Sequence, residues 1–225
     1  MGGTLRYGDD GAYIIDDKQC ITWVYKVKDH HGIGIVACAR SATTYMTYLL
    51  RDLGYNVGHE KWGPDGSVGY HLVVVRPENC FHQVRDPIKQ ISSMMTHRSW
   101  GFCNQVIQLD NRDLKGCMQY WYLWNKLCEE FCVWRYQIEQ LPIVWNEFLD
   151  RIGHEHCPIP EIPVDTNTAT INKKSASWDD LFKEDRKLAQ DIFNMAQEYG
   201  YDTPEMDKVE AKNLRELETA EVVSV

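Results

Sequence analysis

The sequence predicts an α/β protein with a largely parallel sheet. Two places along the chain show the same order of a short apolar strand, a tight polar loop and a helix. The first covers residues 32–55, and the second lies within residues 73–97, which carry one or two strands and a helix. Alternation of strands and helices is typical of parallel α/β folds. In such sheets ligands bind beyond the carboxyl ends of the strands, where both loops fall.

The first unit begins with an apolar run from Gly32 to Ala37 and continues into small and hydroxylated residues. A helix start offers N–H groups without intrahelical partners and the positive end of the helix dipole, which together favour an anion. Arg40 adds a forked donor set suited to phosphate or sulfate oxygens. Three residues add hydroxyl donors: Ser41, Thr43 and Thr44. The alternative is a plain helix N-cap by Ser41 or Thr43 without any ligand.

This loop fits the Walker A pattern poorly. In the register G-x-x-x-x-G-K-[ST], Ala37 and Ala42 occupy the two glycine positions. Thr43 occupies the lysine position, so only Thr44 matches. A nucleoside-triphosphate kinase or ATPase uses that lysine on the β- and γ-phosphates. The residues therefore disfavour a P-loop kinase, which is the weakest of the three functions that the sequence suggests.

The second unit places a charged turn between a strand and a helix. The strand runs from Phe81 to Val84, and Pro87 occupies a favoured position in the first helical turn. Arg85 lies at the end of the strand, where it can contact a phosphate with two nitrogens. Ser93 follows about two helical turns later and can donate from the helix surface.

Together the two loops resemble the cofactor signatures of sulfotransferases that use 3′-phosphoadenosine 5′-phosphosulfate (PAPS). In that family [RK]-S-G-T-T cradles the 5′-phosphosulfate. The Arg and Ser of R-[DNH]-P-x-x-x-x-x-S hold the 3′-phosphate. The stretch from Arg40 to Thr44 matches the first signature except at Ala42, which replaces the usual glycine. Arg85 and Ser93 match the second, including its spacing. Ala42 must then adopt a backbone shape that an alanine can hold.

The resemblance continues over roughly residues 32–203. It includes a Trp/Asn helix, an R-[YV]-E-D-L-like strand, a basic loop and a closing helix, at Trp121–Asn125, Trp134–Leu141, Ile171–Lys174 and Trp178–Tyr201. It implies a single-domain, P-loop-like, three-layer α/β/α fold over residues 1–207, followed by a charged tail at 208–225. It also implies that Lys173 and Lys174 reach the 3′-phosphate and that Tyr45 stacks on the adenine. A solvated lysine pair and a core tyrosine are the alternatives.

The resemblance implies in-line transfer of a sulfuryl group from PAPS to a hydroxyl acceptor, leaving adenosine 3′,5′-bisphosphate. Arg40 and the N–H groups of Ser41 to Thr44 would stabilise the charge on the leaving phosphate, and no metal is demanded. An alcohol acceptor needs a general base. Glu60 occupies about the place of the glutamate in the tyrosylprotein sulfotransferase branch, and His59 is the second candidate. The alternative is that both are ordinary loop residues.

Composition limits the classes of function. The chain has 225 residues, of which 44% are hydrophobic, enough for one sizeable core. The net charge of −9 disfavours a nucleic-acid partner. We expect no membrane span, and eight cysteines without C-x-x-C or a secretory signal predict reduced thiols in the cytoplasm. The acceptor that the resemblance implies is a hydroxyl-bearing small molecule, a glycan or a tyrosine. The alternative is a non-catalytic nucleotide- or anion-binding protein on the same fold.

Outside the two units, the sequence predicts strands near Tyr13–Ile15 and at Ile21–Val27, and a glycine-rich loop at 56–72. The apolar periodicity predicts helices over 113–134, 145–152 and 178–200.

Overall fold

A five-stranded sheet, parallel throughout, forms the centre of the fold. The computed structural model describes residues 3–8, 11–16, 21–26, 32–96, 103–107, 109, 113–162 and 175–204. The strand order is β5-β6-β4-β7-β8, and every neighbouring pair is parallel. The strands are β5 (Gly58–His59), β6 (Gly66–Val68), β4 (Ile33–Ala37), β7 (Cys80–Val84) and β8 (Trp134–Gln137). The predicted α/β class with a largely parallel sheet is confirmed for this unit.

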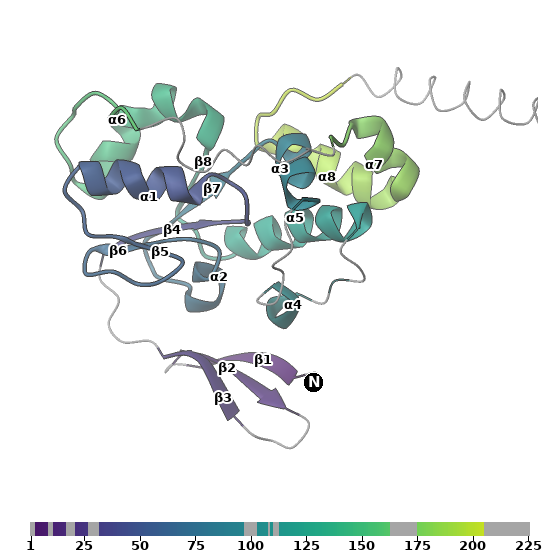
Figure 1. The fold of residues 1–225 in the computed structure, drawn as a ribbon, viewed down its shortest axis with the longest axis horizontal. Coiled ribbons are helices and arrows are strands. Elements are labelled where there is room, and N and C mark those ends of the chain that lie inside the picture. The colour runs from purple at the N-terminus through teal and green to yellow at the C-terminus, as the bar shows by residue number, and fades with distance from the viewer. Residues whose placement is uncertain are drawn as a thin grey trace, which may run out of the picture.

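Helices cover both faces of the sheet, which gives three layers (Figure 1). One face packs against α1 (Thr43–Asp52) and α6 (Leu141–Ile152). The other face packs against the remaining helices, namely α2 (Leu72–Val75), α3 (Pro87–Met94), α4 (Cys103–Val106), α5 (Leu114–Glu129), α7 (Trp178–Glu184) and α8 (Arg186–Glu198). Along β4, Ile33 and Ile35 enter the first apolar cluster, whereas Val36 enters the second. This double burial explains why β4 is apolar at every position.

The connections place both predicted loops at the point where the winding of the sheet reverses. From β4 the chain passes through α1 to β5 and β6 on one side of the sheet. From β7 it passes through α3 and α5 to β8 on the other side. Because β4 and β7 are neighbours, their carboxyl ends border the crevice where open α/β sheets bind ligands.

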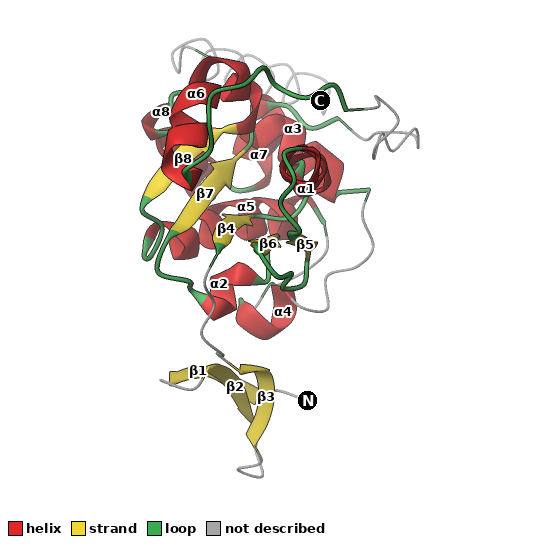
Figure 2. Ribbon diagram, turned by 90° about the vertical axis from the view of Figure 1, so that its left-hand side faces the viewer, coloured by secondary structure: helices red, strands yellow, loops and turns green. Residues whose placement is uncertain are grey.

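A separate three-stranded antiparallel sheet precedes this unit. It consists of β1 (Gly3–Gly8), β2 (Gly11–Asp16) and β3 (Ile21–Lys26), in the order β1-β2-β3. Figures 1 and 2 show it apart from the main sheet, on the side of α2 and α4. The two strands predicted in this region coincide with β2 and β3, whereas β1 was not predicted.

Several predicted boundaries are wrong. The single helix expected over 178–200 is two helices, because Asp185 ends α7 and its carboxylate caps α8 by accepting from the Leu188 N–H at 3.1 Å. The helix expected over 113–134 ends at Glu129, and α6 begins at Leu141 rather than at residue 145. The apolar run before Arg76 is the short helix α2, so the described part of residues 73–97 contains one strand, in agreement with the expected one or two. The loop expected at 56–72 contains two short strands, the edge strand β5 and its neighbour β6.

Within the part of the chain that the structure describes, no helix has both the length and the apolar character that crossing a bilayer requires.

Candidate anion-binding site

The loop between β4 and α1 has an unusual backbone. Arg40 has φ 70° and Ala42 has φ 60° and ψ 31°, so both residues are left-handed. Ala42 is the N-cap of α1, and no side chain caps this helix. Capping by Ser41 or Thr43, the alternative to a ligand site, is therefore wrong. The N–H groups of the first helical turn have no acceptor within the helix, so they are suited to an anion.

The carbonyl groups of this loop are turned toward the neighbouring unit. Gln90 Nε2 on α3 donates to the Ala39 carbonyl at 2.7 Å. Arg85 Nη1 donates to the Arg40 carbonyl at 2.7 Å. Gln83 Nε2 on β7 donates to the carbonyl of Ser41, the next residue along the loop. In a trans peptide the N–H points opposite to the C=O. The N–H groups that follow these carbonyls therefore point away from β7 and α3, which is the arrangement of an anion-binding nest.

Residues of both predicted signatures contact each other at Arg40. Its Nε donates to Ser93 Oγ on α3 at 3.1 Å, while its carbonyl accepts from Arg85. Both arginines are partly buried, and neither forms an ion pair with a carboxylate among the described residues. Burial first, and the charge of Arg85 second, lower the pKa of Arg40. Two neighbouring cations that form no ion pair among the described residues leave positive charge that an anion can balance.

Ser41 provides a second sign of an incomplete site. The residue is fully buried, and its Oγ has no hydrogen-bond partner among the described residues. Buried hydroxyl groups nearly always have a partner, so a group without one calls for a ligand or a water.

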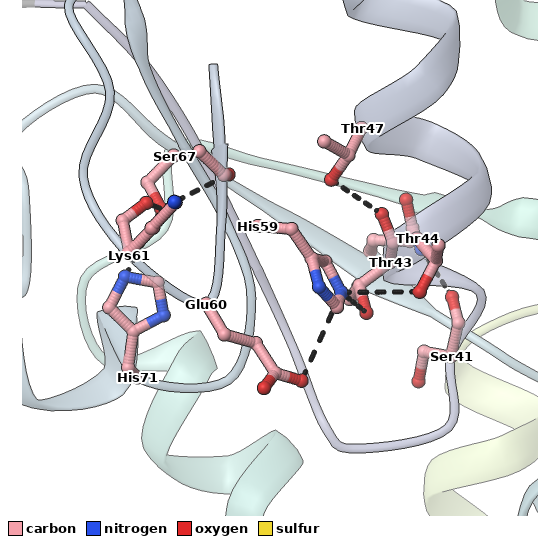
Figure 3. Close-up of polar contacts among 11 residues, drawn as sticks. Ser41, Thr43, Thr44, Thr47, His59, Glu60, Lys61, Ser67 and His71 are labelled. Atoms are coloured by element: carbon pink, nitrogen blue, oxygen red, sulfur yellow. Dashed lines mark hydrogen bonds and ion pairs between the residues drawn. The ribbon is translucent and has the colours of Figure 1, made fainter.

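His59 and Glu60 approach the same loop from the end of β5. Figure 3 shows both side chains extending toward the residues that begin α1. His59 Nε2 lies 3.1 Å from Thr43 Oγ1, 3.3 Å from Thr44 Oγ1 and 3.9 Å from Glu60 Oε1. Burial lowers the pKa of His59, opposed by the charge of Glu60. The neutral ring can therefore bond the threonine hydroxyls at neutral pH.

Glu60 itself has a strained backbone. Its φ is 54°, a left-handed value that is costly for a residue with a side chain, and its N–H donates to the Val68 carbonyl at 3.0 Å. Its charge acts on Arg40 as well as on His59, because it opposes the fall in the pKa of both, and after burial it is the next cause that raises the pKa of Tyr70 to about 12. The Glu60 carboxylate thus lies between the cationic loop and Tyr70.

The helix α5 supports the second unit through Trp121 and Asn125. Trp121 Nε1 donates to the Arg85 carbonyl at 3.4 Å, and Asn125 Nδ2 donates to the Trp121 carbonyl at 2.7 Å. Asn125 Oδ1 lies 3.0 Å from Nε2 of His82, which is fully buried on β7. Burial lowers the pKa of His82 to about 3, so this histidine is a neutral packing residue.

The structure brings together seven of the predicted site residues at the carboxyl ends of the strands. Those that meet at the sheet edge are Arg40, Ser41, Ala42, Thr43, Thr44, Arg85 and Ser93, and the two base candidates, His59 and Glu60, lie beside them. Tyr45 is partly buried and packs against the apolar cluster on the α1 face, in agreement with the core alternative. Lys173 and Lys174 lie outside the described residues.

Sequence reasoning missed three side chains that shape the loop. Gln83 and Gln90 hold loop carbonyls, and Tyr136 on β8 donates to Gln83 Oε1 at 2.7 Å. The signal that could have found Gln83 is its position, because an amide inside a buried strand must have partners.

One cavity lies away from this site. A cavity of about 740 Å³ opens at the amino ends of the strands, beside Ile33, Phe81 and Arg151, and therefore at the opposite end of the sheet. Among the described residues, no group of three or more His, Cys, Asp or Glu side chains is arranged to hold a metal. The described cysteines are all free thiols.

Comparisons of the chain with family models, with curated proteins and with solved structures found no match. The assignment of a function therefore depends on the geometry of this site.

Proposed function

We propose that this chain is a sulfotransferase that transfers the sulfuryl group of PAPS to a hydroxyl acceptor. The observation that carries the proposal is the meeting of the two signatures. Arg85 holds the Arg40 carbonyl at 2.7 Å, and Arg40 in turn bonds Ser93 at 3.1 Å. A nucleotide with phosphates at both its 5′ and 3′ positions needs two anion-binding groups side by side, and this arrangement offers them at the switch point of the sheet.

The residues present fit such a nucleotide. The backbone N–H groups that follow the turned carbonyls, together with Arg40, would hold the 5′-phosphosulfate. Arg85 and Ser93 would hold the 3′-phosphate. The partnerless Ser41 hydroxyl supports this fit, because a bound oxyanion would supply its missing acceptor. Lys173 and Lys174, outside the described residues, complete the proposed set. The P-loop-like description of the fold belongs to the same proposal.

The chemistry assigns separate tasks to the chain's own residues. PAPS supplies a sulfuryl group attached to a phosphate that can leave. The loop N–H groups and Arg40 stabilise negative charge at that phosphate without any rearrangement. Glu60 takes the proton of the acceptor hydroxyl. His59 already contacts two threonine hydroxyls, which favours Glu60 as the base and His59 as the group that orients the first turn of α1. The free thiols support a cytoplasmic location.

One observation favours a second candidate function. Ala42 holds a left-handed conformation that costs an alanine roughly 1–2 kcal/mol and a glycine almost nothing. A loop under strain is compatible with a protein that binds a nucleotide or another anion without turnover. The two candidates share the binding site and differ in the role of Glu60.

Binding is tested first, by isothermal titration with adenosine 3′,5′-bisphosphate, ADP and ATP–Mg²⁺. We expect the bisphosphate to bind at least about tenfold more tightly than ADP, because only it engages Arg85 and Ser93. Arg85→Ala should weaken bisphosphate binding by about 100-fold, since charge-assisted hydrogen bonds contribute roughly 1.5–3 kcal/mol each. Arg151→Ala, at the other end of the sheet, is the matched control. Equal or tighter binding of ATP–Mg²⁺ would instead favour a nucleotide kinase.

Turnover separates the two candidates. With PAPS and a panel of phenols, sugars and peptides containing tyrosine, we expect transfer by the wild type. Glu60→Gln should lower the rate by about 10²-fold or more and leave bisphosphate affinity unchanged. Binding by both proteins without transfer to any acceptor would support the non-catalytic function.

A further inference from the structure

A buried chain of hydrogen bonds runs across the sheet to the anion-binding loop. Tyr136 Oη on β8 donates to Gln83 Oε1 on β7 at 2.7 Å, and Gln83 Nε2 donates to the Ser41 carbonyl beyond β4. Gln83 and Ser41 are completely buried, and Tyr136 is 4% exposed. The three residues belong to neighbouring segments, because β7 pairs with both β4 and β8.

Chemistry fixes the direction of every bond in this chain. The Ser41 carbonyl can only accept, so the amide must present Nε2 to it and Oε1 to the tyrosine. Burial raises the pKa of Tyr136 well above its ordinary value, so the hydroxyl keeps its proton and donates. A flipped amide would place oxygen against oxygen at Ser41 and lose the hydrogen bond that holds the loop carbonyl.

The chain controls which groups of the loop face the crevice. Drawing the Ser41 carbonyl toward β7 turns the N–H of Ala42 to the opposite side, because the two groups share one trans peptide. Arg85 and Gln90 hold the two preceding carbonyls in the same way. Gln83 differs from Arg85 in being wholly buried, so its task is to hold the loop.

We propose that Tyr136 and Gln83 are positioning residues that keep the Ser41 carbonyl away from the ligand and the Ala42 N–H facing it. The inference rests on the proposed function, because the oxyanion in the loop is taken to be the 5′-phosphate of a 3′,5′-bisphosphate. Tyr136 and Gln83 would then affect binding of the 5′-phosphate alone. The 3′-phosphate depends on Arg85 and Ser93, which the Tyr136–Gln83 chain does not contact.

This division predicts selective losses in affinity. By isothermal titration, Tyr136→Phe should weaken binding of adenosine 3′,5′-bisphosphate by about tenfold, as one buried hydrogen bond and the orientation of the amide are lost. Gln83→Met, which has a similar volume and no donor, should weaken it by about 30-fold. Neither variant should change the affinity for adenosine 3′-monophosphate by more than about twofold, because that ligand lacks the loop phosphate. Equal losses for both nucleotides, or no loss, would overturn the proposal.

Tyr55→Phe is the matched control, because Tyr55 packs against the same apolar cluster at the far end of the sheet. Thermal unfolding of all three variants identifies a general loss of structure. If Tyr136→Phe does not fold, Gln83→Met still decides the outcome.

A readout without nucleotide separates this inference from the proposed function. In ligand-free protein we expect Tyr136→Phe to shift the backbone amide NMR resonances of residues 40–44, and Tyr55→Phe to leave them in place. Unchanged loop resonances would refute the positioning role whatever the protein binds. If the loop resonances shift but the wild type binds no bisphosphate, the chain of hydrogen bonds stands and the sulfotransferase proposal falls.

Discussion

The two strand–loop–helix units, β4–α1 and β7–α3, look alike in sequence and differ in how their helices begin. At α3 the Asp86 carboxylate caps the helix by accepting from the Lys89 N–H at 2.8 Å, and Pro87 occupies the first turn. At α1 the N-cap is Ala42, whose methyl group cannot accept a hydrogen bond. The first-turn donors of α3 are thus partly satisfied within the protein, whereas those of α1 are available to a ligand.

The two strands also differ in the polarity of their buried residues. Every residue of β4 is apolar or glycine, but β7 buries His82 and Gln83. The second unit also supplies Arg85 and Gln90, so its side chains hold three successive carbonyls of the first loop. One unit presents backbone N–H groups, and the other holds that backbone in place. A strand–loop–helix unit that lacks its own cap and is held by a neighbour is therefore the better candidate for an anion site.

The largest loss of ligand affinity is expected when α1 is given an acidic N-cap like that of α3. Ala42→Asp places a carboxylate at the N-cap, in a left-handed conformation that aspartate tolerates better than most residues. The new charge competes with the ligand for the same donors, so bisphosphate affinity should fall by about 100-fold or more while thermal stability is kept or raised. Titration calorimetry and thermal unfolding measure the two effects.

Ala42→Asn is the control for this variant, because it changes the shape without the charge. A loss of affinity confined to the aspartate supports an anion at the start of α1. Retained binding in Ala42→Asp would place the phosphate elsewhere.

The second prediction uses His82, a buried residue that distinguishes β7 from β4, and His71, a partly buried residue that precedes α2. Burial lowers the pKa of His82 to about 3 and that of His71 to about 4. Both values lie below the ordinary value of about 6.5, so below that pH the unfolded chain binds more protons than the folded one. The free energy of unfolding should therefore fall as the pH is lowered from 6.5 toward 4, by about 1.4 kcal/mol per pH unit for each histidine. Urea unfolding between pH 7.5 and 4.5 measures this slope.

His82→Gln keeps a donor for Asn125 and removes the titrating group. It should reduce the slope by about 1.4 kcal/mol per pH unit and leave the slope due to His71. Identical slopes in the variant and the wild type would show that His82 is not held neutral by burial.

The sequence could predict the parts of this molecule whose signal is local. The apolar run of β4 and the turn at Arg85 identify two buried strands and the loops that follow them, since such strands have few alternatives. The strands β5 and β6 within 56–72 were not predicted, because they are short and rich in glycine and their pairing depends on a partner rather than on periodicity. The break between α7 and α8 was not predicted for a different reason, because Asp185 is both the C-cap of α7 and the N-cap of α8.

Long-range contacts account for the rest of the site. The resemblance gives Arg40 to one signature and Ser93 to the other, and a bond between residues 53 positions apart leaves no local pattern. The same holds for Gln83, whose partners lie 42 and 53 positions away. Thr43 and His59 meet only because β5 joins the sheet at the edge nearest α1. The residue types of the site could be predicted, but their division into ligand-facing and supporting groups could not.

A smaller effect is expected on removing the cap of α3. Asp86→Ala should lower the free energy of unfolding by about 1 kcal/mol, because the Lys89 N–H loses its acceptor. It should change bisphosphate affinity by less than about threefold, since the donors of α3 are used within the protein. Ser177→Ala, which removes the capping box of α7, serves as a control with a similar cost in stability. A large loss of affinity in Asp86→Ala alone would mean that both helix starts contact the ligand.

The smallest effect concerns Ala42 itself, the residue at which this loop departs from the resemblance. A left-handed alanine costs roughly 1–2 kcal/mol, and Ala42→Gly relieves that cost while adding about 0.4–1 kcal/mol of chain entropy to lose on folding. The variant should therefore be more stable by about 0.5–1 kcal/mol in urea unfolding, with an unchanged dependence on denaturant. If Ala42→Gly also leaves bisphosphate affinity unchanged, the neighbouring unit already holds the alanine in its binding shape. If affinity rises together with stability, the loop of the wild type is only partly held, and the strain at Ala42 reduces binding. A destabilised variant would contradict the left-handed geometry on which the comparison of the two helix starts depends.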